Sequence, residues 1–293
     1  MNENKTNINW YPGHMAKTKK QIIQDLKLID VVIEILDARI PISSHNPDLE
    51  DIIRNKKKVI LLNKSDLAEE KANKKWVEYF KNKGMSAVLV DCNLGKGIND
   101  VTIKIKEIMK DELEKQAQKG KIGQKIRVLV MGIPNVGKSS YINRATKKVS
   151  AKVGNRPGVT KQKQWIKLDN SIELLDTPGV LWPKFQTNKI AFNLAFTGTI
   201  KDEISESTEL AYELLKLLIK EYPQNIIDRY KLENLETTSQ NQTLEIMEKI
   251  GQKRGAIVSG GRVSLEKTAN IILEDFRSGK IGRITLEKVE GIN

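Results

Sequence analysis

The sequence predicts an α/β fold in which a mostly parallel sheet is flanked by helices and followed by a small all-α domain. Short apolar runs rich in β-branched residues recur up to residue 176, as expected of buried parallel strands. Charged stretches with helical spacing separate these runs. From residue 205 onward the apolar spacing is helical. We therefore predict an N-terminal arm over residues 1–24, an α/β domain over 25–200 and a helical domain over 201–293.

Composition excludes several classes of protein. No apolar run approaches the ~18 residues of a membrane span, and the polar start, Met1 to Trp10, lacks the apolar core of a signal peptide. The single cysteine, Cys92, excludes an intrachain disulfide framework and fits a reducing compartment. We expect a cytoplasmic, monomeric protein that does not associate with membranes.

The net charge points to a polyanionic partner. The chain carries a formal charge of +13, and its distribution is uneven. Residues 201–293 hold 14 Lys and Arg against 16 Asp and Glu, a balance of −2, whereas residues 1–200 hold 36 against 21, a balance of +15. Nucleic acid is the favoured partner, and a lysine- and isoleucine-rich genome composition is the alternative explanation.

The N-terminal arm contains a compact aromatic cluster, Trp10-Tyr11-Pro12-Gly13-His14-Met15, followed by several lysines. Aromatic rings beside lysines suit base stacking and phosphate neutralisation. Packing of the same rings onto the neighbouring domain is the competing interpretation.

The first two predicted strands lead to a base-recognition motif. A strand over residues 31–36 ends at Asp37-Ala38-Arg39, and a strand over 58–62 ends at Asn63-Lys64-Ser65-Asp66, where ligands of open α/β sheets bind. The pattern Asn-Lys-x-Asp after a buried strand is typical of guanine recognition. The Asp66 carboxylate would accept hydrogen bonds from N1–H and the exocyclic amine of guanine. Lys64 would lie along the base, and Asn63 would brace the loop. Adenine offers neither donor pair, which disfavours ATP.

A helix over residues 69–83, a strand over 87–90 and a helix over 98–114 are predicted next. The loop after this strand begins with Asp91 and Cys92, at the place where GTPases close over guanine with backbone N–H groups. A Ser-Ala pair is usual there, so this loop departs from the pattern. We interpret Cys92 as a small loop residue and not as a nucleophile, because no base lies beside it in the sequence.

A phosphate loop follows the next predicted strand, residues 126–131. Its motif, Gly132-Ile133-Pro134-Asn135-Val136-Gly137-Lys138-Ser139, precedes a predicted helix, which is the context that GxxxxGK[ST] requires. Lys138 would reach the β- and γ-phosphates, and the Ser139 hydroxyl would bind Mg²⁺. The predicted nucleotide contacts in this loop are Asn135, Val136, Gly137, Lys138, Ser139 and Ser140.

Two candidate switches follow. The segment Val149–Thr160 reads as a mobile loop that ends in Thr160, which would bind Mg²⁺ and sense the γ-phosphate. A strand over residues 172–175 presents Asp176-Thr177-Pro178-Gly179. Asp176 is the expected outer ligand of Mg²⁺, and the Gly179 N–H is the expected γ-phosphate sensor.

The order and content of these motifs are unusual. The guanine motifs precede the phosphate loop, so the domain is predicted to be a circularly permuted P-loop GTPase, which is feasible because domain termini often lie close together. Val180 follows Gly179, where signalling GTPases have a glutamine that orients the attacking water. Slow intrinsic hydrolysis is expected unless another group orients water. His14 is the first candidate for orienting water, and His45 is the second because its neighbouring residues are more typical of a loop.

The permuted motifs, the aromatic arm, Asp37-Ala38-Arg39 and the apolar residue after Gly179 together resemble the ribosome biogenesis GTPase A family. The resemblance covers essentially the whole chain. It implies GTP hydrolysis, late assembly of the large (50S) ribosomal subunit, contact with its rRNA, stimulation by that particle and His14 as the proposed catalytic residue. Asn135 matches the asparagine with which similar GTPases hold K⁺, so activation by K⁺ is a hypothesis.

The helical domain admits several interpretations. Helices are predicted from residue 205 and over 224–230, 243–251 and 265–278. The resemblance implies an RNA-binding domain, and a plain stabilising or dimerising bundle is the alternative. A GTP-dependent partner of an RNA-modifying enzyme is a different functional class, disfavoured because no second catalytic constellation appears in the sequence. A nucleotide-independent RNA scaffold is disfavoured by the intact nucleotide motifs.

Overall fold

The computed structural model describes residue 20 and residues 22–121, 123–147, 164–176, 187–200, 204–236 and 241–291. The chain divides into two compact units, one comprising Met1–Thr187 with Glu287–Asn293 and the other comprising Asn188–Leu286. The boundary predicted from the sequence lies after residue 200. The chain thus passes from the first unit into the second, and its last residues return to the first.

The first unit is built on a six-stranded sheet with the order β3-β2-β1-β4-β6-β5. Only the edge pair, β5 and β6, is antiparallel; the other neighbouring pairs are parallel. The carboxyl ends of the parallel strands therefore meet at one edge of the sheet, where the candidate motifs emerge. The strands are β1 Val31–Asp37, β2 Lys57–Asn63, β3 Ser86–Leu89, β4 Ile126–Met131, β5 Gln164–Lys167 and β6 Ile172–Asp176.

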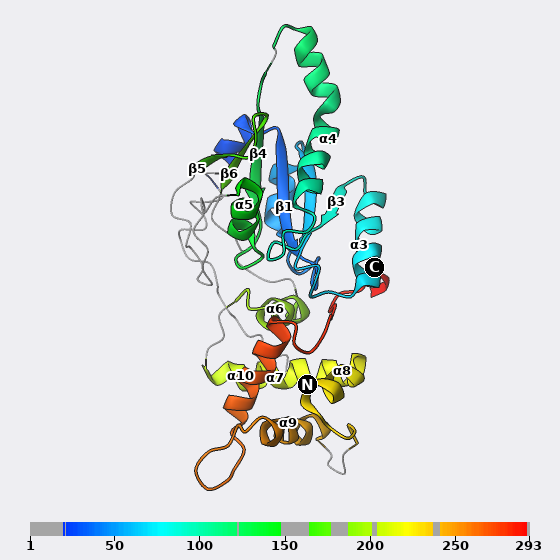
Figure 1. Ribbon diagram of the computed structural model, residues 1–293, viewed down its shortest axis with the longest axis vertical. Coiled ribbons are helices and arrows are strands. Elements are labelled where there is room, and N and C mark those ends of the chain that lie inside the picture. The colour runs from blue at the N-terminus through cyan, green and yellow to red at the C-terminus, as the bar shows by residue number, and fades with distance from the viewer. Residues whose placement is uncertain are drawn as a thin grey trace. The chain divides into compact units, whose positions relative to one another are not determined.

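Helices cover both faces of this sheet. On one face, Val32 and Leu36 of β1 lie in apolar clusters with the segment around Leu26 and with α3. In Figure 1, α4 and α5 lie in front of the sheet, where they contact each other. The described helical elements of this unit are η1 Leu26–Leu28, α2 Pro47–Ile53, α3 Glu70–Asn82, α4 Ile98–Gln118, α5 Lys138–Thr146 and η2 Val289–Gly291.

The strand order accounts for the permuted motifs. The strands that carry the guanine motifs, β1 to β3, come first in the chain and lie on one side of β4, while β6 lies on the other. Register pairing places Val31 opposite Val128 and Asp37 opposite Asn63. Helix α4 and the residues after it carry the chain from the outer strand β3 back to the centre of the sheet, where β4 begins.

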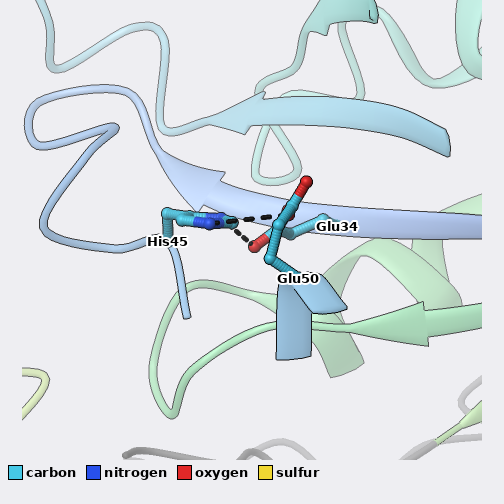
Figure 2. A group of neighbouring side chains, drawn as sticks. All are labelled: Glu34, His45 and Glu50. Carbon is cyan, nitrogen blue, oxygen red and sulfur yellow. Dashed lines mark hydrogen bonds and ion pairs between the residues drawn. The ribbon is translucent and has the colours of Figure 1, made fainter. Parts of the chain in front are cut away.

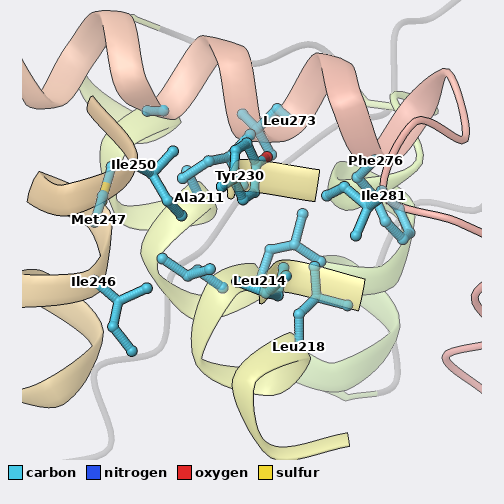
Figure 3. Packing of buried hydrophobic residues seen from close by; sticks show 14 of the residues in the cluster. Ala211, Leu214, Leu218, Tyr230, Ile246, Met247, Ile250, Leu273, Phe276 and Ile281 are labelled. Carbon is cyan, nitrogen blue, oxygen red and sulfur yellow. The ribbon is translucent and has the colours of Figure 1, made fainter. Parts of the chain in front are cut away.

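The second unit is helical. Its core contains Leu214 and Leu218 of α7, Ile250 of α9, and Leu273 and Phe276 of α10, all almost completely buried (Figure 3). The described helices are α6 Asn188–Phe196, α7 Ile204–Glu221, α8 Pro223–Tyr230, α9 Gln242–Lys253 and α10 Leu265–Arg277. Within the described ranges, no helix of either unit is long and apolar enough to cross a membrane.

Candidate nucleotide-binding site

The phosphate loop occupies the turn between β4 and α5, and its glycines are sterically required. Gly137 has φ +102°, and a Cβ there would lie 2.3 Å from Nδ2 of Asn63. At Gly132, a Cβ would lie 2.7 Å from the carbonyl oxygen of Ile35. Asn135 also adopts a left-handed conformation, with φ 61°. The loop therefore has the tight backbone path that turns successive N–H groups toward an anion at a helix N-terminus.

Lys138 is the first residue of α5 and is 8% exposed. Its Nζ donates a hydrogen bond to the carbonyl oxygen of Ile133, 2.8 Å away and inside the same loop. The ammonium group therefore lies against the loop whose backbone donors would surround a polyphosphate. This position is the one expected of the phosphate-loop lysine. Ser139 and Ser140 follow it in the first turn of α5 and are partly exposed.

Asn63 joins three loops at the carboxyl edge of the sheet. Its Nδ2 donates to the carbonyl oxygen of Val136 in the phosphate loop, at 2.7 Å. Its Oδ1 accepts from the backbone N–H of Cys92 in the loop after β3, at 3.2 Å. Because Asn63 itself ends β2 and is 3% exposed, one buried amide links the predicted base-binding loops to the phosphate-binding loop. The structure thus brings together motifs that lie 73 residues apart in sequence.

The rest of the base-recognition loop is supported from both sides. Ser65 is held from α3, where Nδ2 of Asn73 donates to its carbonyl oxygen at 2.8 Å. Lys64, which has a positive φ of 59°, forms an ion pair with Asp37 at 2.9 Å. Asp66, the predicted guanine reader, is exposed at the end of the loop. A side chain that must meet a ligand is expected to be accessible, so this exposure fits its role.

The ion pair at Lys64 belongs to a buried charged cluster. Asp37 also accepts hydrogen bonds from Arg39, at 3.0 Å to Nε and 2.7 Å to the terminal nitrogen. Burial alone would raise the pKa of Asp37, but the two cations outweigh it and hold the pKa far below its usual range. Burial and the nearby Arg39 guanidinium lower the pKa of Lys64, although Asp37 opposes them. Asp37 therefore remains ionised and fixes the Lys64 side chain.

The loop after β3 is held by hydrogen bonds around Asp91. The Asp91 carboxylate accepts from the N–H groups of Asn93 and Leu94, at 2.8 and 3.0 Å. Arg144 of α5 donates to the carbonyl oxygens of Cys92 and Asn93. Burial and the neighbouring Asp91 raise the pKa of Cys92 to about 12, so its thiol is unreactive near neutral pH. The interpretation of Cys92 as a small loop residue agrees with this environment.

His45, the second candidate for orienting water, is engaged in ion pairs with two glutamates. Figure 2 shows Glu34 and Glu50 on one side of its ring; Nδ1 lies 2.7 Å from Glu34 and Nε2 lies 3.5 Å from Glu50. Lys58 pairs with both carboxylates, at 2.9 and 2.7 Å, so this potential metal-binding group already holds an ammonium cation. Although burial would raise it, the pKa of Glu34 is lowered to about 2 by His45 and Lys58.

Several predicted site residues lie outside the described residues: His14, Thr160 and Gly179. Asp176 is the last residue of β6 and pairs in register with Val130 of the phosphate-loop strand. The predicted magnesium ligands are hydroxyl and carboxylate oxygens, the donors that Mg²⁺ prefers. Of these, Asp176 ends β6 and Ser139 lies in the helix that follows the neighbouring strand β4, so the donor set fits this ion.

The residues that support the loops of this site were not predicted from the sequence. The roles of Asn73 and Arg144, and the ion pair of Asp37 with Lys64, depend on contacts between separate elements, which no local pattern signals. The Asp-Ala-Arg sequence after β1 was visible as a motif, and a carboxylate beside an arginine at a strand end is the one available signal of the buried cluster.

Comparisons with known proteins agree with this geometry. Residues 127–252 match the family described as 50S ribosome-binding GTPase, a match that begins in β4 and does not include the guanine motif. The ribosome biogenesis GTPase A of Bacillus cereus is 43% identical over 97% of this chain and 94% of its own length. A GDP-bound structure of TM YlqF has a TM-score of 0.64 at 27% identity, over 92% of this chain and 99% of that one. A GNP-bound YlqF structure from T. maritima has a TM-score of 0.63 at 27% identity, over 94% and 100%. With its phosphate loop, guanine motif and permuted sheet, the chain belongs to the ribosome biogenesis GTPase A family.

Proposed function

We propose that this protein binds and hydrolyses GTP and acts as a late assembly factor of the large (50S) ribosomal subunit. The observation that carries the nucleotide assignment is the bridge made by Asn63 between the phosphate loop and the loop at Cys92. This bridge supports the proposal because it connects the predicted base-recognition loop to the phosphate loop at one edge of the sheet. A nucleotide requires both, and the Asn-Lys-x-Asp pattern of residues 63–66 favours guanine as its base.

Each end of GTP would contact a separate set of side chains. Asp66 would accept from the guanine N1–H and amine, with Asn63, Lys64, Ser65, Asp91 and Cys92 around the base. Lys138 and the loop from Asn135 to Ser140 would hold the phosphates. Mg²⁺, held by Ser139, Thr160 and Asp176, would neutralise charge on the β- and γ-phosphates. K⁺ held by Asn135 would add a further positive charge at the same place.

The excess positive charge of the first 200 residues suits contact with rRNA, and the family to which the chain belongs supports a ribosomal partner. In this proposal GTP orders Thr160 and Gly179 and favours binding of the monomeric protein to the assembling particle. Hydrolysis relaxes both segments and releases it. Only contacts that differ between the two nucleotide states can shift binding in this way.

The proposal is tested by GTP turnover in K⁺ buffer, with and without purified large ribosomal subunits, for wild type and His14→Ala. The expected result is strong stimulation by the subunits, lost in the variant while nucleotide binding is retained. Stimulation that survives in His14→Ala would reject the role of His14 alone. Brisk turnover without subunits, unchanged by adding them, would reject the ribosome-triggered mechanism. Equal turnover in Na⁺ and K⁺ buffers would reject activation by K⁺.

A further inference from the structure

The last residues of the chain return to the guanine-binding end of the first unit. We define the C-terminal strap as residues 287–291, which include η2. Its first residue, Glu287, is 8% exposed although it lies in a short connecting segment. A carboxylate this deeply buried needs hydrogen-bond donors, and the structure supplies them from the segment that follows β1.

The Glu287 carboxylate caps the turn over residues 40–44. It accepts from the backbone N–H of Ile42 at 2.7 Å and of Ser43 at 3.1 Å, and also from the Ser43 hydroxyl. The next residue, Ser44, accepts from the backbone N–H of Asp37 at 3.0 Å. Asp37 in turn forms the buried ion pair with Lys64. The strap therefore supports one side of the base-recognition loop through the turn that orients Asp37.

The same residue also holds the other side of that loop. Nε1 of Trp76, a fully buried side chain of α3, donates to the carbonyl oxygen of Glu287 at 2.9 Å. One turn earlier on α3, Asn73 donates to the carbonyl oxygen of Ser65. In addition, Val289 packs against the apolar cluster that includes Leu62, the residue before the guanine motif. Both supports of the base-recognition loop thus converge on Glu287.

We infer that Glu287 is a positioning residue for the guanine-recognition loop and that the C-terminal strap controls the rate of guanine nucleotide release. The inference rests on the proposed role of residues 63–66 in base recognition. With the strap in place, the loop is preformed and the base is retained. When the strap loosens, the loop loses its two supports and the base dissociates faster. Residue 286 is the last of the helical unit, so the strap directly follows that unit in the chain.

The test compares dissociation of fluorescently labelled GDP, measured by stopped flow, from wild type, Glu287→Gln and Glu290→Gln. Glutamine keeps the size of the side chain but loses the charge that strengthens three hydrogen bonds. Glu290 lies in the same strap, is exposed and pairs only with Lys75 among the described ion pairs, so its variant is the matched control. We expect dissociation to accelerate on the order of 5- to 10-fold in Glu287→Gln and to stay unchanged in Glu290→Gln.

A second readout separates positioning from general destabilisation. Steady-state turnover should show a raised KM for GTP with kcat unchanged, at a temperature well below the unfolding midpoint of both variants. Ser43→Ala, which removes one donor to the same carboxylate, should give a smaller acceleration, roughly 2-fold, and remains usable if Glu287→Gln does not fold.

The outcomes are distinguishable from failure of the base assignment. Asp66→Asn serves as the reference variant, because it must weaken GDP binding if residues 63–66 recognise guanine. Unchanged dissociation in Glu287→Gln and Ser43→Ala, with binding weakened in Asp66→Asn, would overturn the role of the strap alone. Unchanged binding in Asp66→Asn would overturn the base assignment. A fall in kcat with unchanged KM in Glu287→Gln would also contradict the inference.

Discussion

Removing the Asn63 side chain tests the link between the base-binding and phosphate-binding loops. The Asn63→Ala variant loses the hydrogen bonds to Val136 and Cys92, both made by a side chain in a residue that is 3% exposed. Each such hydrogen bond contributes a net ~0.5–1.5 kcal/mol. Nucleotide binding must then hold the loops together without the bridge, so we expect a loss of about 1 to 3 kcal/mol of binding free energy, which corresponds to roughly 5- to 150-fold in affinity.

The affinity for labelled GDP and for a non-hydrolysable GTP analogue is measured by fluorescence titration, with circular dichroism to confirm that the variant is folded. Asn82→Ala is the matched control, since Asn82 is exposed at the C-terminal end of α3 and lies outside the site. A change of less than twofold in Asn63→Ala, or an equal loss in Asn82→Ala, would refute the bridge as an energetic link.

Three further predictions concern the loop geometry and the buried charges. Gly137→Ala should weaken GDP binding in fluorescence titration at least as much as Asn63→Ala, because φ +102° is strained for alanine and its Cβ would displace the Asn63 amide 2.3 Å away; unchanged binding would contradict the steric argument. Asp37→Asn should lower the free energy of unfolding, measured with urea, by about 3–5 kcal/mol, because two buried cations lose their partner. A smaller loss would show that the cluster is solvated. In wild type, the contribution of Asp37 is present above pH 3.8 and is lost as the pH falls, since its pKa is lowered in the folded state. His45→Gln should lower the free energy of unfolding most between pH 4.5 and 6.5, where both His45 and Glu34 are charged. Because the pKa of His45 is raised on folding, this loss of unfolding free energy should shrink as the pH rises further. A loss that does not depend on pH would contradict the ion pair.

Most elements of the fold were predictable because their signals are local. Strand β4 coincides with the predicted residues, and β1, β2 and β6 are each extended by one or two residues. Buried parallel strands are continuously apolar, which makes them easy to find. Helix α4 continues to Gln118, beyond the predicted end at residue 114, because the lysine- and glutamine-rich segment is compatible with helix.

Three elements were missed for identifiable reasons. Strand β5 is a short antiparallel edge strand, and its four residues alternate polar and apolar side chains too briefly to stand out. Helix α2 begins at Pro47, in the interval between the first two predicted strands where no helix was predicted; proline is well suited to the first position of a helix. Helix α6 is apolar on several sides and lies in the interval assigned to the end of the α/β domain.

The candidate site was predictable in its motifs but not in its connections. The sequence identified Asn63 and the phosphate loop separately, because each motif follows an apolar strand. It did not indicate that the Asn63 amide contacts Val136, or that Glu287 contacts Ser43 across 244 positions. Such contacts arise only when the sheet order places distant segments together, and a single sequence contains no local signal for them.

The most direct test of the central claim, that residues 63–66 recognise guanine at this site, is the nucleotide preference of Asp66→Asn. Affinities of wild type and variant are measured for GDP and for xanthosine diphosphate, whose base carries a carbonyl oxygen in place of the exocyclic amine. The account predicts that the variant loses affinity for GDP and gains affinity for the xanthosine nucleotide, because an amide can donate where the carboxylate only accepts. An unchanged preference for GDP would contradict it.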